Sequence, residues 1–303
     1  MERDFHHWLQ QHCPPTGDQI IVGIGDDAAI VDFGGPTVIT SDSIADKVHF
    51  DSSVHSLKQI GHKAIAVSLS DIAAMGSRPI AASVDLFIPR RLEFEDLKRL
   101  FESLASTAKK YHCQIVGGDT NRWDGPLVLS TNVYGVAAAQ SGHAWLMSNA
   151  KPDDLICVTG PLGGSLLGKH IAFEPRLDLA IRLAENYNIS AATDITDSLA
   201  IDLKSLATAS GCGFVIDAAD VPVSDAAREM AKTNGSVPLD HALYDGEDFE
   251  LLFCLSETEL EKIKLDKDFG QPIYRIGTMS HEERFLINRD GSKTKLEIRG
   301  YEH

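Results

Sequence analysis

Short apolar runs alternate with two amphipathic helical patterns in the first half of the chain. The runs have the length of β-strands and cover residues 19–24, 37–40, 80–88, 114–116 and 127–137. One helix is predicted to begin near Ser56, a suitable N-cap, and another to span residues 93–110 with an apolar stripe on one face. This alternation of strands and helices predicts an α/β fold.

The second half carries a similar pattern after two polar stretches, residues 140–143 and 149–154, which predict a domain junction. Strands are expected at residues 155–159, 213–217 and 249–255, and helices at 164–171, 176–186 and 198–210. A chain of 303 residues is about twice the length of a typical domain. We therefore expect two α/β domains, residues 1–140 and residues 150–303.

The chain carries 44 acidic and 28 basic residues, a formal net charge of −16. A field of this sign repels nucleic-acid phosphates and anionic lipid surfaces, so no nucleic-acid partner is expected. An anionic substrate would need a divalent cation bound by some of the carboxylates. No apolar run approaches the ~18 residues of a membrane span and the N-terminus lacks a signal-peptide core, so neither membrane insertion nor export is expected.

Five cysteines are scattered along the chain without a CxxC pair. Four of them lie in or beside apolar, strand-like runs, as Cys157 does, which is typical of reduced thiols packed as small hydrophobic side chains. Reduced thiols predict a cytoplasmic location.

An acidic residue beside Gly, Ser or Thr follows a short apolar run at six places, which are residues 26–27, 42, 71, 119, 194–197 and 245–248. Turn chemistry explains any one such place, but strand ends converge on one crevice in sheet-based folds. Two carboxylates about 4 Å apart repel by roughly 4 kcal/mol at an effective dielectric constant near 20, so several together need cations. Ligands made only of oxygen favour Mg²⁺ or Mn²⁺, which commonly accompany phosphate substrates.

Two glycine motifs partly match nucleotide-binding loops. The segment from Gly23 to Ala28 fits GxGxxA, but it places two carboxylates where a pyrophosphate would lie and no amphipathic helix follows it. Residues 163–170 fit GxxxxGK with His170 in place of the Ser or Thr that binds Mg²⁺. A dinucleotide fold and a P-loop are therefore disfavoured, and the second set of glycines is interpreted as a helix start or an anion contact.

Motifs for a catalytic nucleophile or a metalloprotease, GxSxG and HExxH, are absent, so hydrolase activity is disfavoured. Two single residues leave alternatives open. His49 either contacts a substrate phosphate or is a half-buried histidine, and Arg122 either contacts phosphate or is a surface arginine.

The chain resembles the thiamine-monophosphate kinase family in an ordered set of segments, which are residues 25–28, 40–43 with 48–50, 69–76, 117–120, 158–160, 194–197 and 246–252. The LSDIAAMG and GGDT blocks are highly specific to this family and to its superfamily, the aminoimidazole ribonucleotide synthetase-like enzymes that use ATP. The resemblance covers nearly the whole chain. It implies a two-domain α/β architecture with mixed sheets, and a homodimer whose N-terminal domains join their sheets. It also implies that ATP and several Mg²⁺ ions bind between the domains.

The resemblance further implies roles for individual residues. The metal ligands expected by position are Asp27, Thr40, Ser41, Asp42, Asp71, Asp119, Asp194 and Asp197. Contacts to ATP are expected from Gly118, Asp119 and Thr196, and contacts to thiamine monophosphate from His49, Glu247 and the position of Ile298. The implied reaction moves the γ-phosphoryl group of ATP onto thiamine monophosphate. No residue is expected to act as acid or base, because a phosphate monoester is already mostly dianionic at pH 7.

Two positions depart from the family pattern in ways that bear on its ligands. Met147 stands where the family commonly has an arginine that touches ATP. Ile298 stands where the family places an aromatic residue against the thiamine ring, which removes a stacking contact of about 1 kcal/mol. Two alternatives therefore remain beside the kinase: a superfamily enzyme with a different acceptor, and a nucleotide-binding relative without catalysis.

Overall fold

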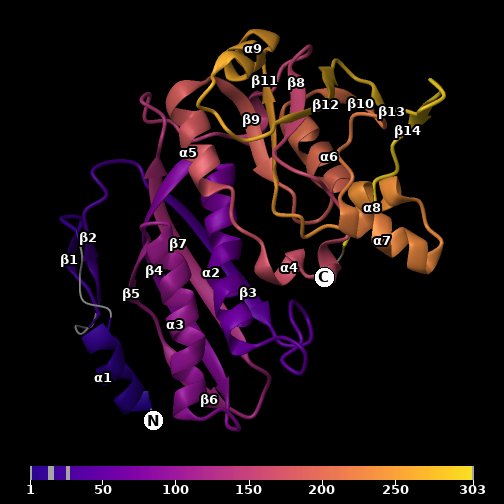
Figure 1. The fold of residues 1–303 in the computed structure, drawn as a ribbon. Coiled ribbons are helices and arrows are strands. Elements are labelled where there is room, and N and C mark those ends of the chain that lie inside the picture. The colour runs from indigo at the N-terminus through magenta and orange to yellow at the C-terminus, as the bar shows by residue number, and fades with distance from the viewer. Residues whose placement is uncertain (1, 13–16, 25–27, 302–303) are drawn as a thin grey trace. The chain divides into compact units, whose positions relative to one another are not determined.

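A computed structural model describes residues 2–12, 17–24 and 28–301 of the chain (Figure 1). The chain divides into two compact units, the first formed by Met1–Ile72 with Ser77–Ala137 and the second by Ala73–Gly76 with Ala138–His303. Each unit combines helices with a mixed β-sheet, which confirms the α/β class predicted from the sequence. The domain limits 1–140 and 150–303 stay a prediction, as does the assignment of ATP and Mg²⁺ binding and of dimerisation to the first domain.

Unit 1 is built on a sheet with the strand order β3-β7-β4-β5, in which β6 also pairs with β4. Its strands are β1 (Ile20–Val22), β2 (Ile30–Val31), β3 (Val38–Ala45), β4 (Ser77–Pro89), β5 (Gln114–Gly117), β6 (Thr120–Trp123) and β7 (Val128–Ala137), and its helices are α1 (Glu2–His12), α2 (Leu57–Ala74) and α3 (Phe94–Lys110). Strands β3, β7 and β4 are antiparallel, while β5 and β6 run parallel to β4. Strands β1 and β2 form a separate pair.

Helices α2 and α3 lie side by side in unit 1 (Figure 1). The stripe predicted for residues 93–110 is buried along α3, and it includes Leu97 and Leu104. A Cβ atom at Gly61 of α2 would lie 2.2 Å from the carbonyl oxygen of Leu100, so only glycine permits this close approach. Tight packing on α3 holds α2 in position, and the polar side chains near the C-terminal end of α2 meet β3.

Unit 2 is built on a seven-stranded sheet with the order β14-β13-β10-β12-β8-β11-β9. Its strands are β8 (Leu155–Val158), β9 (Ile189–Asp194), β10 (Gly213–Asp217), β11 (Leu251–Leu255), β12 (Tyr274–Ser280), β13 (Arg284–Ile287) and β14 (Lys293–Lys295). Its helices are the short turns η1 (Met147–Asn149) and η2 (Ser165–Leu167), and α4 (Lys169–Ala172), α5 (Leu177–Asn186), α6 (Leu199–Ala209), α7 (Asp225–Asn234), α8 (Pro238–Tyr244) and α9 (Glu257–Leu265). Strands β10 and β13 are parallel, and the other pairs are antiparallel.

Every residue of β8 and β11 is buried, as their uninterrupted apolar runs predict. The sequence pattern misses other elements, which are α1, α7, α8, α9, β2, β6, β9, β12, β13 and β14. Strand β9 has only one large apolar side chain, Ile189, and forms because it pairs with β11. Helix α7 buries only Ala227 and Ala231. The dependence of β9 on long-range pairing and the small size of the buried side chains of α7 therefore account for these two omissions.

The described cysteines, Cys113, Cys157, Cys212 and Cys254, are buried free thiols, as expected; Cys13 lies outside the described residues. Burial raises the pKa of Cys113 and of Cys157 to about 12, so these thiols stay protonated and unreactive at neutral pH. Among the described helices, none has the length and apolar character needed to cross a membrane.

Candidate active site

Strand β3 and helix α2 bring together three of the predicted metal ligands. Thr40 and Asp42 stand two residues apart on β3, so their side chains project from the same face of the strand. Asp71 of α2 accepts a hydrogen bond from Thr40 Oγ1, and Ser68 Oγ of the same helix donates to Asp42 Oδ2 at 2.8 Å. The oxygens of Thr40, Asp42 and Asp71 therefore lie along the contact between one strand and one helix.

The side chain of Ser41 points to the opposite face of β3, because side chains alternate along a strand. Its neighbours across the sheet are polar: Asn132 of β7 and Ser83 of β4. Further along the same face of β4, Asp85 Oδ1 accepts the backbone N–H of Asp119 at 2.9 Å. This face thus connects Ser41 with the loop of Asp119. The sequence does not mark Asp85 as a candidate site residue, because it stands inside a long apolar run.

The loop between β5 and β6 passes too close to β4 to carry a side chain at Gly118. The φ angle of Gly118 is +143°, and a Cβ atom there would lie 1.8 Å from the carbonyl oxygen of Val84. The carboxylate of the next residue, Asp119, accepts the backbone N–H of Thr120 at 2.8 Å and the side-chain amide of Asn121 at 2.6 Å. The predicted contact of Gly118 and Asp119 with ATP stays a prediction.

His49 lies in the turn that follows β3. Its Nδ1 atom accepts the backbone N–H of Ala45 at 3.1 Å, so the proton of a neutral ring is on Nε2. Lys63 of α2, whose side chain is fully buried, donates to the carbonyl oxygen of His49 at 2.9 Å. Fully buried lysines are rare unless paired, and this one ties the His49 turn to α2. Its position within an ordinary helical pattern gives no signal in the sequence.

Two residues bear on which side chains could neutralise the negative charge of a triphosphate. Met147 in η1 packs against the hydrophobic core of unit 2, so its side chain serves packing. Arg122 Nη2 donates to the carbonyl oxygens of Arg90 and Leu92 at 2.7 and 3.3 Å, and its buried Nε has no hydrogen-bond partner among the described residues. One nitrogen of the Arg122 guanidinium, Nη2, therefore already donates its hydrogen bonds to backbone carbonyl oxygens.

Two loops of unit 2 carry most of the other candidates and are hydrogen bonded to each other. The first follows β9 and carries Thr196 and Asp197 just after the buried Asp194. The second precedes β11 and carries Glu247, whose backbone N–H donates to the carbonyl oxygen of Thr196 at 2.7 Å. Because β9 and β11 are paired strands, this bond continues their pairing beyond the strand ends. The structure thus places Thr196 and Glu247 side by side.

The second loop has an unusual backbone. The φ angles are +75° at Gly246, +49° at Glu247 and +50° at Phe249. Residues other than glycine lose about 1–2 kcal/mol in this region, and such strain is commonly found at functional sites. A Cβ atom at Gly246 would lie 2.5 Å from the carbonyl oxygen of Asp197, and the ring of Phe249 stacks on Phe173 with centroids 3.7 Å apart. Surrounding contacts therefore hold the loop in this conformation.

A buried ion network anchors the loop at its C-terminal end. Glu250, 1% exposed, accepts two hydrogen bonds of 2.6 Å from Arg176, one of 2.8 Å from Lys169 and one of 2.7 Å from Thr159 Oγ1. Burial acts to raise the pKa of Glu250, but Arg176 and Lys169 outweigh it and hold this pKa below its usual range. Burial raises the pKa of Asp248 to about 7, although Lys169 lies 3.6 Å away. Two acids and two cations thus share one enclosed region.

The GxxxxGK segment belongs to this network. Gly163 N–H donates to both oxygens of Asp248 at 3.0 and 2.9 Å, and Gly164 N–H donates to Asp245 Oδ2 at 2.8 Å. The Lys169 side chain also turns to this network instead of extending over the glycines. The anions that these glycine N–H groups contact are therefore carboxylates of the chain itself.

The C-terminal segment packs on the first loop of unit 2. The backbone N–H of Tyr301 donates to the carbonyl oxygen of Asp197 at 3.0 Å. Ile298 is 42% exposed, and the guanidinium of the adjacent Arg299 lies 4.1 Å above the ring of Tyr244. The side chain that departs from the family pattern is thus partly open to solvent, next to an arginine stacked on an aromatic ring.

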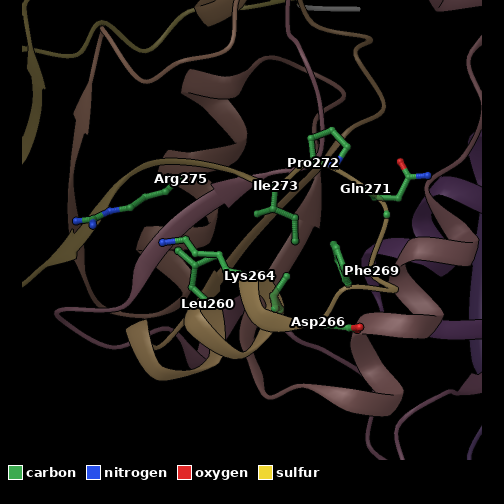
Figure 2. A pocket seen from close by; sticks show the side chains of 10 residues that line it. Leu260, Lys264, Asp266, Phe269, Gln271, Pro272, Ile273 and Arg275 are labelled. Carbon is green, nitrogen blue, oxygen red and sulfur yellow. The ribbon is translucent and has the colours of Figure 1, made fainter.

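A cavity of about 410 Å³ lies between α9 and the segment leading to β12 (Figure 2). Leu260 and Phe269 form part of its apolar wall, Lys264 and Arg275 extend toward one end, and Asp266 lies at the other. Asp266 already accepts hydrogen bonds of 2.8 Å from an arginine and a tyrosine of the neighbouring chain segment. None of the candidate ligands lines this cavity, so it is separate from the proposed chemistry.

The donor atoms of the candidate residues fit a hard divalent cation. Within the described residues, no three His, Cys, Asp or Glu side chains form a metal-binding group; Asp27, together with residues 25–26, lies outside them. The described candidates for metal ligands supply carboxylate and hydroxyl oxygens, without thiol or imidazole. Mg²⁺ commonly binds through one or two carboxylates together with substrate phosphates. The residues therefore suit a cation that binds with a phosphate ligand better than an all-protein metal cage.

Comparison with known proteins defines the class of the chain. Residues 25–137 match the family model described as AIR synthase related protein, N-terminal domain, and residues 133–287 match the corresponding C-terminal domain. Thiamine-monophosphate kinase of Rhodopirellula baltica is 41% identical over 286 residues, which cover 91% of this chain and 89% of that protein. The Bacillus subtilis enzyme of the same name is 32% identical over 93% of both chains.

Solved structures agree with these sequence matches. Thiamine-monophosphate kinase from Stenotrophomonas maltophilia superposes with a TM-score of 0.80 and 29% identity, covering 96% of each chain. The structure described as AaThiL complexed with AMPPCP and TMP shares the fold, with a TM-score of 0.76 at 23% identity over 100% of this chain and 96% of that one. The chain belongs to the thiamine-monophosphate kinase family, and its two-domain architecture is that of the AIR synthase related proteins.

Proposed function

We propose that the protein transfers the γ-phosphoryl group of ATP to thiamine monophosphate, forming thiamine diphosphate and ADP. The structural observation that carries the proposal is the set of oxygen donors, Thr40, Asp42 and Asp71, gathered between β3 and α2. The relatives named above are thiamine-monophosphate kinases, and one structure of the same fold holds AMPPCP and TMP. Donors of this kind suit a reaction between two phosphate-bearing substrates.

The acceptor needs little activation by the protein. A phosphate monoester has a second pKa near 6, so thiamine monophosphate is mostly dianionic at pH 7 and is already a nucleophile. The obstacle is the approach of two polyanions in line with each other. The residues of the chain therefore act by binding and orienting the two phosphates.

We assign Mg²⁺ binding to Asp27, Thr40, Ser41, Asp42, Asp71, Asp119, Asp194 and Asp197. When bound, Mg²⁺ would neutralise charge on the phosphate oxygens. The hydrogen bonds that Asp42 and Asp71 receive from hydroxyl groups fix the direction of their carboxylates before any ligand arrives. Such preorganisation reduces the cost of assembling the site around the substrates.

We assign contacts to ATP to Gly118, Asp119 and Thr196, and contacts to thiamine monophosphate to His49, Glu247 and Ile298. His49 presents a donor at Nε2, because Nδ1 already accepts a backbone hydrogen bond. That donor suits a phosphate oxygen. Glu247 is held in a strained backbone next to Thr196, which supports a role in positioning a ligand.

We infer that the protein forms a homodimer through the sheet of unit 1. Strand β3 stands at the edge of this sheet, and Ile39 on it is 64% exposed. An exposed strand edge with apolar side chains is a template for pairing with another chain. The face that carries Ser41 would then lie near the partner subunit.

We also infer a cytoplasmic location. The buried free thiols among the described residues support a reducing compartment, where disulfides are rare. ATP, the proposed co-substrate, is an intracellular nucleotide.

The test is to incubate the purified chain with ATP, Mg²⁺ and thiamine monophosphate and to follow thiamine diphosphate and ADP by chromatography. The variant Asp71→Asn keeps the size of the side chain but removes its charge, and we expect its rate to fall by at least about 100-fold. The matched control is Asp124→Asn, an exposed aspartate of the same unit that pairs with Arg90. Its rate should equal that of the wild type.

Formation of ADP that depends on thiamine monophosphate, lost in Asp71→Asn but not in Asp124→Asn, would establish the kinase. A wild-type rate in a folded Asp71→Asn variant would remove Asp71 from the metal site. If the chain binds nucleotide but forms no thiamine diphosphate, the enzyme uses another acceptor. Residues around Ile298 would then be the first to be tested for binding of that acceptor.

A further inference from the structure

Asp202 lies in the first turn of α6 and is only 7% exposed. Its Oδ2 atom accepts the backbone N–H groups of Thr196, Asp197 and Ser198 at 3.0, 3.2 and 3.2 Å. Successive backbone N–H groups that converge on one point form a concave anion site, often called a nest. In this loop the chain fills the nest with its own carboxylate.

This arrangement decides which groups of the loop remain for a ligand. The three N–H groups all donate to Asp202, so they do not serve a phosphate. The groups that remain are the partly exposed side chains of Thr196 and Asp197. On the other side of Asp197, Ser198 Oγ caps α6 by accepting the N–H of Ile201 at 3.1 Å. The backbone that carries Asp197 is therefore fixed on both sides.

Asp202 itself is poorly suited to be a metal ligand, because three donors already occupy one of its oxygens. The carboxylates of Asp194 and Asp197 lie close enough to Asp202 to repel its charge. These neighbouring acids form a negative region within unit 2. A cation held by Asp194 and Asp197 would relieve their repulsion.

We propose that Asp202 is a positioning residue: it holds the 196–198 backbone so that Thr196, Asp197 and the adjacent Asp194 bind a complex of a divalent cation and a nucleotide. The inference rests on the proposed function for the identity of that ligand. Residues that orient metal ligands from behind typically change metal affinity by 10- to 100-fold when they are replaced. No signal in the sequence marks Asp202, which occupies an ordinary position on the helix.

The experiment measures the binding of Mn²⁺ by calorimetry in the presence of a non-hydrolysable ATP analogue, for the full chain and for Asp202→Asn and Asp202→Ala. The matched control is Asp154→Asn in the same unit. Asp154 is 8% exposed and accepts the backbone N–H of Lys151 at 2.9 Å, but it contacts none of the proposed ligands. Circular dichroism and thermal unfolding are recorded for every variant.

We expect the dissociation constant of Mn²⁺ to rise by about 10-fold or more in Asp202→Ala. The rise should be smaller in Asp202→Asn, because an amide oxygen still accepts the N–H groups but forms weaker bonds than a carboxylate. Asp154→Asn should lose stability without a change in Mn²⁺ binding. Should Asp202→Ala fail to fold, the Asn variant decides the question.

Unchanged Mn²⁺ binding in folded Asp202 variants would overturn the proposal. So would equal weakening in Asp154→Asn, which would mean a general structural effect, or a wild-type chain that binds no Mn²⁺–nucleotide. Failure of the proposed function looks different: Mn²⁺–nucleotide binding that depends on Asp202, without formation of thiamine diphosphate, keeps the positioning role and rejects the kinase.

Discussion

The β3–α2 contact of unit 1 and the two hydrogen-bonded loops of unit 2 hold their candidate ligands in different ways. In unit 1, Thr40 and Asp42 lie on β3 and Asp71 on α2, so regular backbone geometry sets the direction of their side chains. In unit 2, Thr196 and Glu247 lie on two irregular loops, whose conformation depends on hydrogen bonds between the loops and with the neighbouring segments. A regular element tolerates the change of one neighbour, whereas a loop depends on each contact that fixes it.

The backbone strain of the unit 2 loops must be offset by contacts elsewhere in that unit. The left-handed backbone of Glu247 and Phe249 in the second loop is unfavourable on its own. Carboxyl groups behind the loop compensate for this cost: Asp248 and Asp245 accept hydrogen bonds from the glycine N–H groups, and Glu250 binds two cations. We therefore expect single changes behind the unit 2 loops to affect stability more than comparable changes in unit 1.

The largest effect is expected for Glu250→Ala. This change removes the carboxylate that pairs with both Arg176 and Lys169 and that accepts the hydrogen bond of Thr159. Breaking a buried ion pair costs about 3–5 kcal/mol, and we expect about 3, because the two cations are 29% and 31% exposed and can reach water. Chemical denaturation measures the loss in the free energy of unfolding.

The control for this change is Asp266→Ala in the same unit. Asp266 also pairs with an arginine, but both side chains are about one-third exposed, at 28% and 34%. The loss in stability should be much smaller than for Glu250→Ala. Similar losses in the two variants would contradict the view that the Glu250 network anchors the loop.

A smaller effect is expected for Gly246→Ala, which tests the loop itself. The new Cβ atom would lie 2.5 Å from the carbonyl oxygen of Asp197, at a φ angle of +75°. We expect a loss of about 2 kcal/mol in the free energy of unfolding. Gly117→Ala in unit 1 is the matched change, because nothing lies within 4 Å of the Cβ position there. It should alter stability by less than about 0.5 kcal/mol.

Thermal or chemical unfolding of both alanine variants provides the comparison. If Gly246→Ala were as stable as Gly117→Ala, the second loop would be free to rearrange, and the contrast between the two units would fail. A loss confined to Gly246→Ala would show that the loop conformation is imposed by its surroundings.

The parts of the molecule that could be predicted from sequence are those where local pattern and structure coincide. The apolar stripe of α3 and the buried runs of β8 and β11 follow directly from hydrophobic periodicity. The alternation of side chains along β3 places Thr40 and Asp42 on one face. The expectation that the acids stand at strand ends is wrong for Asp42, which lies within β3, and for Asp71, which lies within α2. A short apolar run followed by an acid looks the same in a strand and in a helix, so the pattern alone does not separate them.

The parts that could not be predicted depend on contacts between distant residues. Gly163 donates to Asp248, which is 85 positions further along the chain, so the glycine motif gives no indication that its anion is internal. Asp202, Lys63 and Asp85 stand in ordinary helix or strand patterns, and only the fold shows which backbone groups they bind. Sequence periodicity describes one element at a time, and these roles arise between elements.

The smallest effect concerns pH and Asp248. Burial raises the pKa of this carboxyl to about 7, while the unfolded chain keeps the ordinary aspartate value near 4. Between these values the folded state binds more protons than the unfolded state, so this group lowers the free energy of unfolding as pH rises from about 4 to about 7. Asp248→Asn resembles the protonated acid and removes this dependence. Its stability relative to the wild type should therefore increase by about 1 kcal/mol between pH 6 and pH 7.5.

Denaturant unfolding of wild type and variant across this pH range measures the difference, with Asp225→Asn, a fully exposed aspartate of the same unit, as the control. The control difference should stay flat. A flat difference for Asp248→Asn as well would mean that Asp248 stays ionised in the folded state. In that case Lys169 would compensate for its burial, and both carboxylates behind the loop would act as charged anchors.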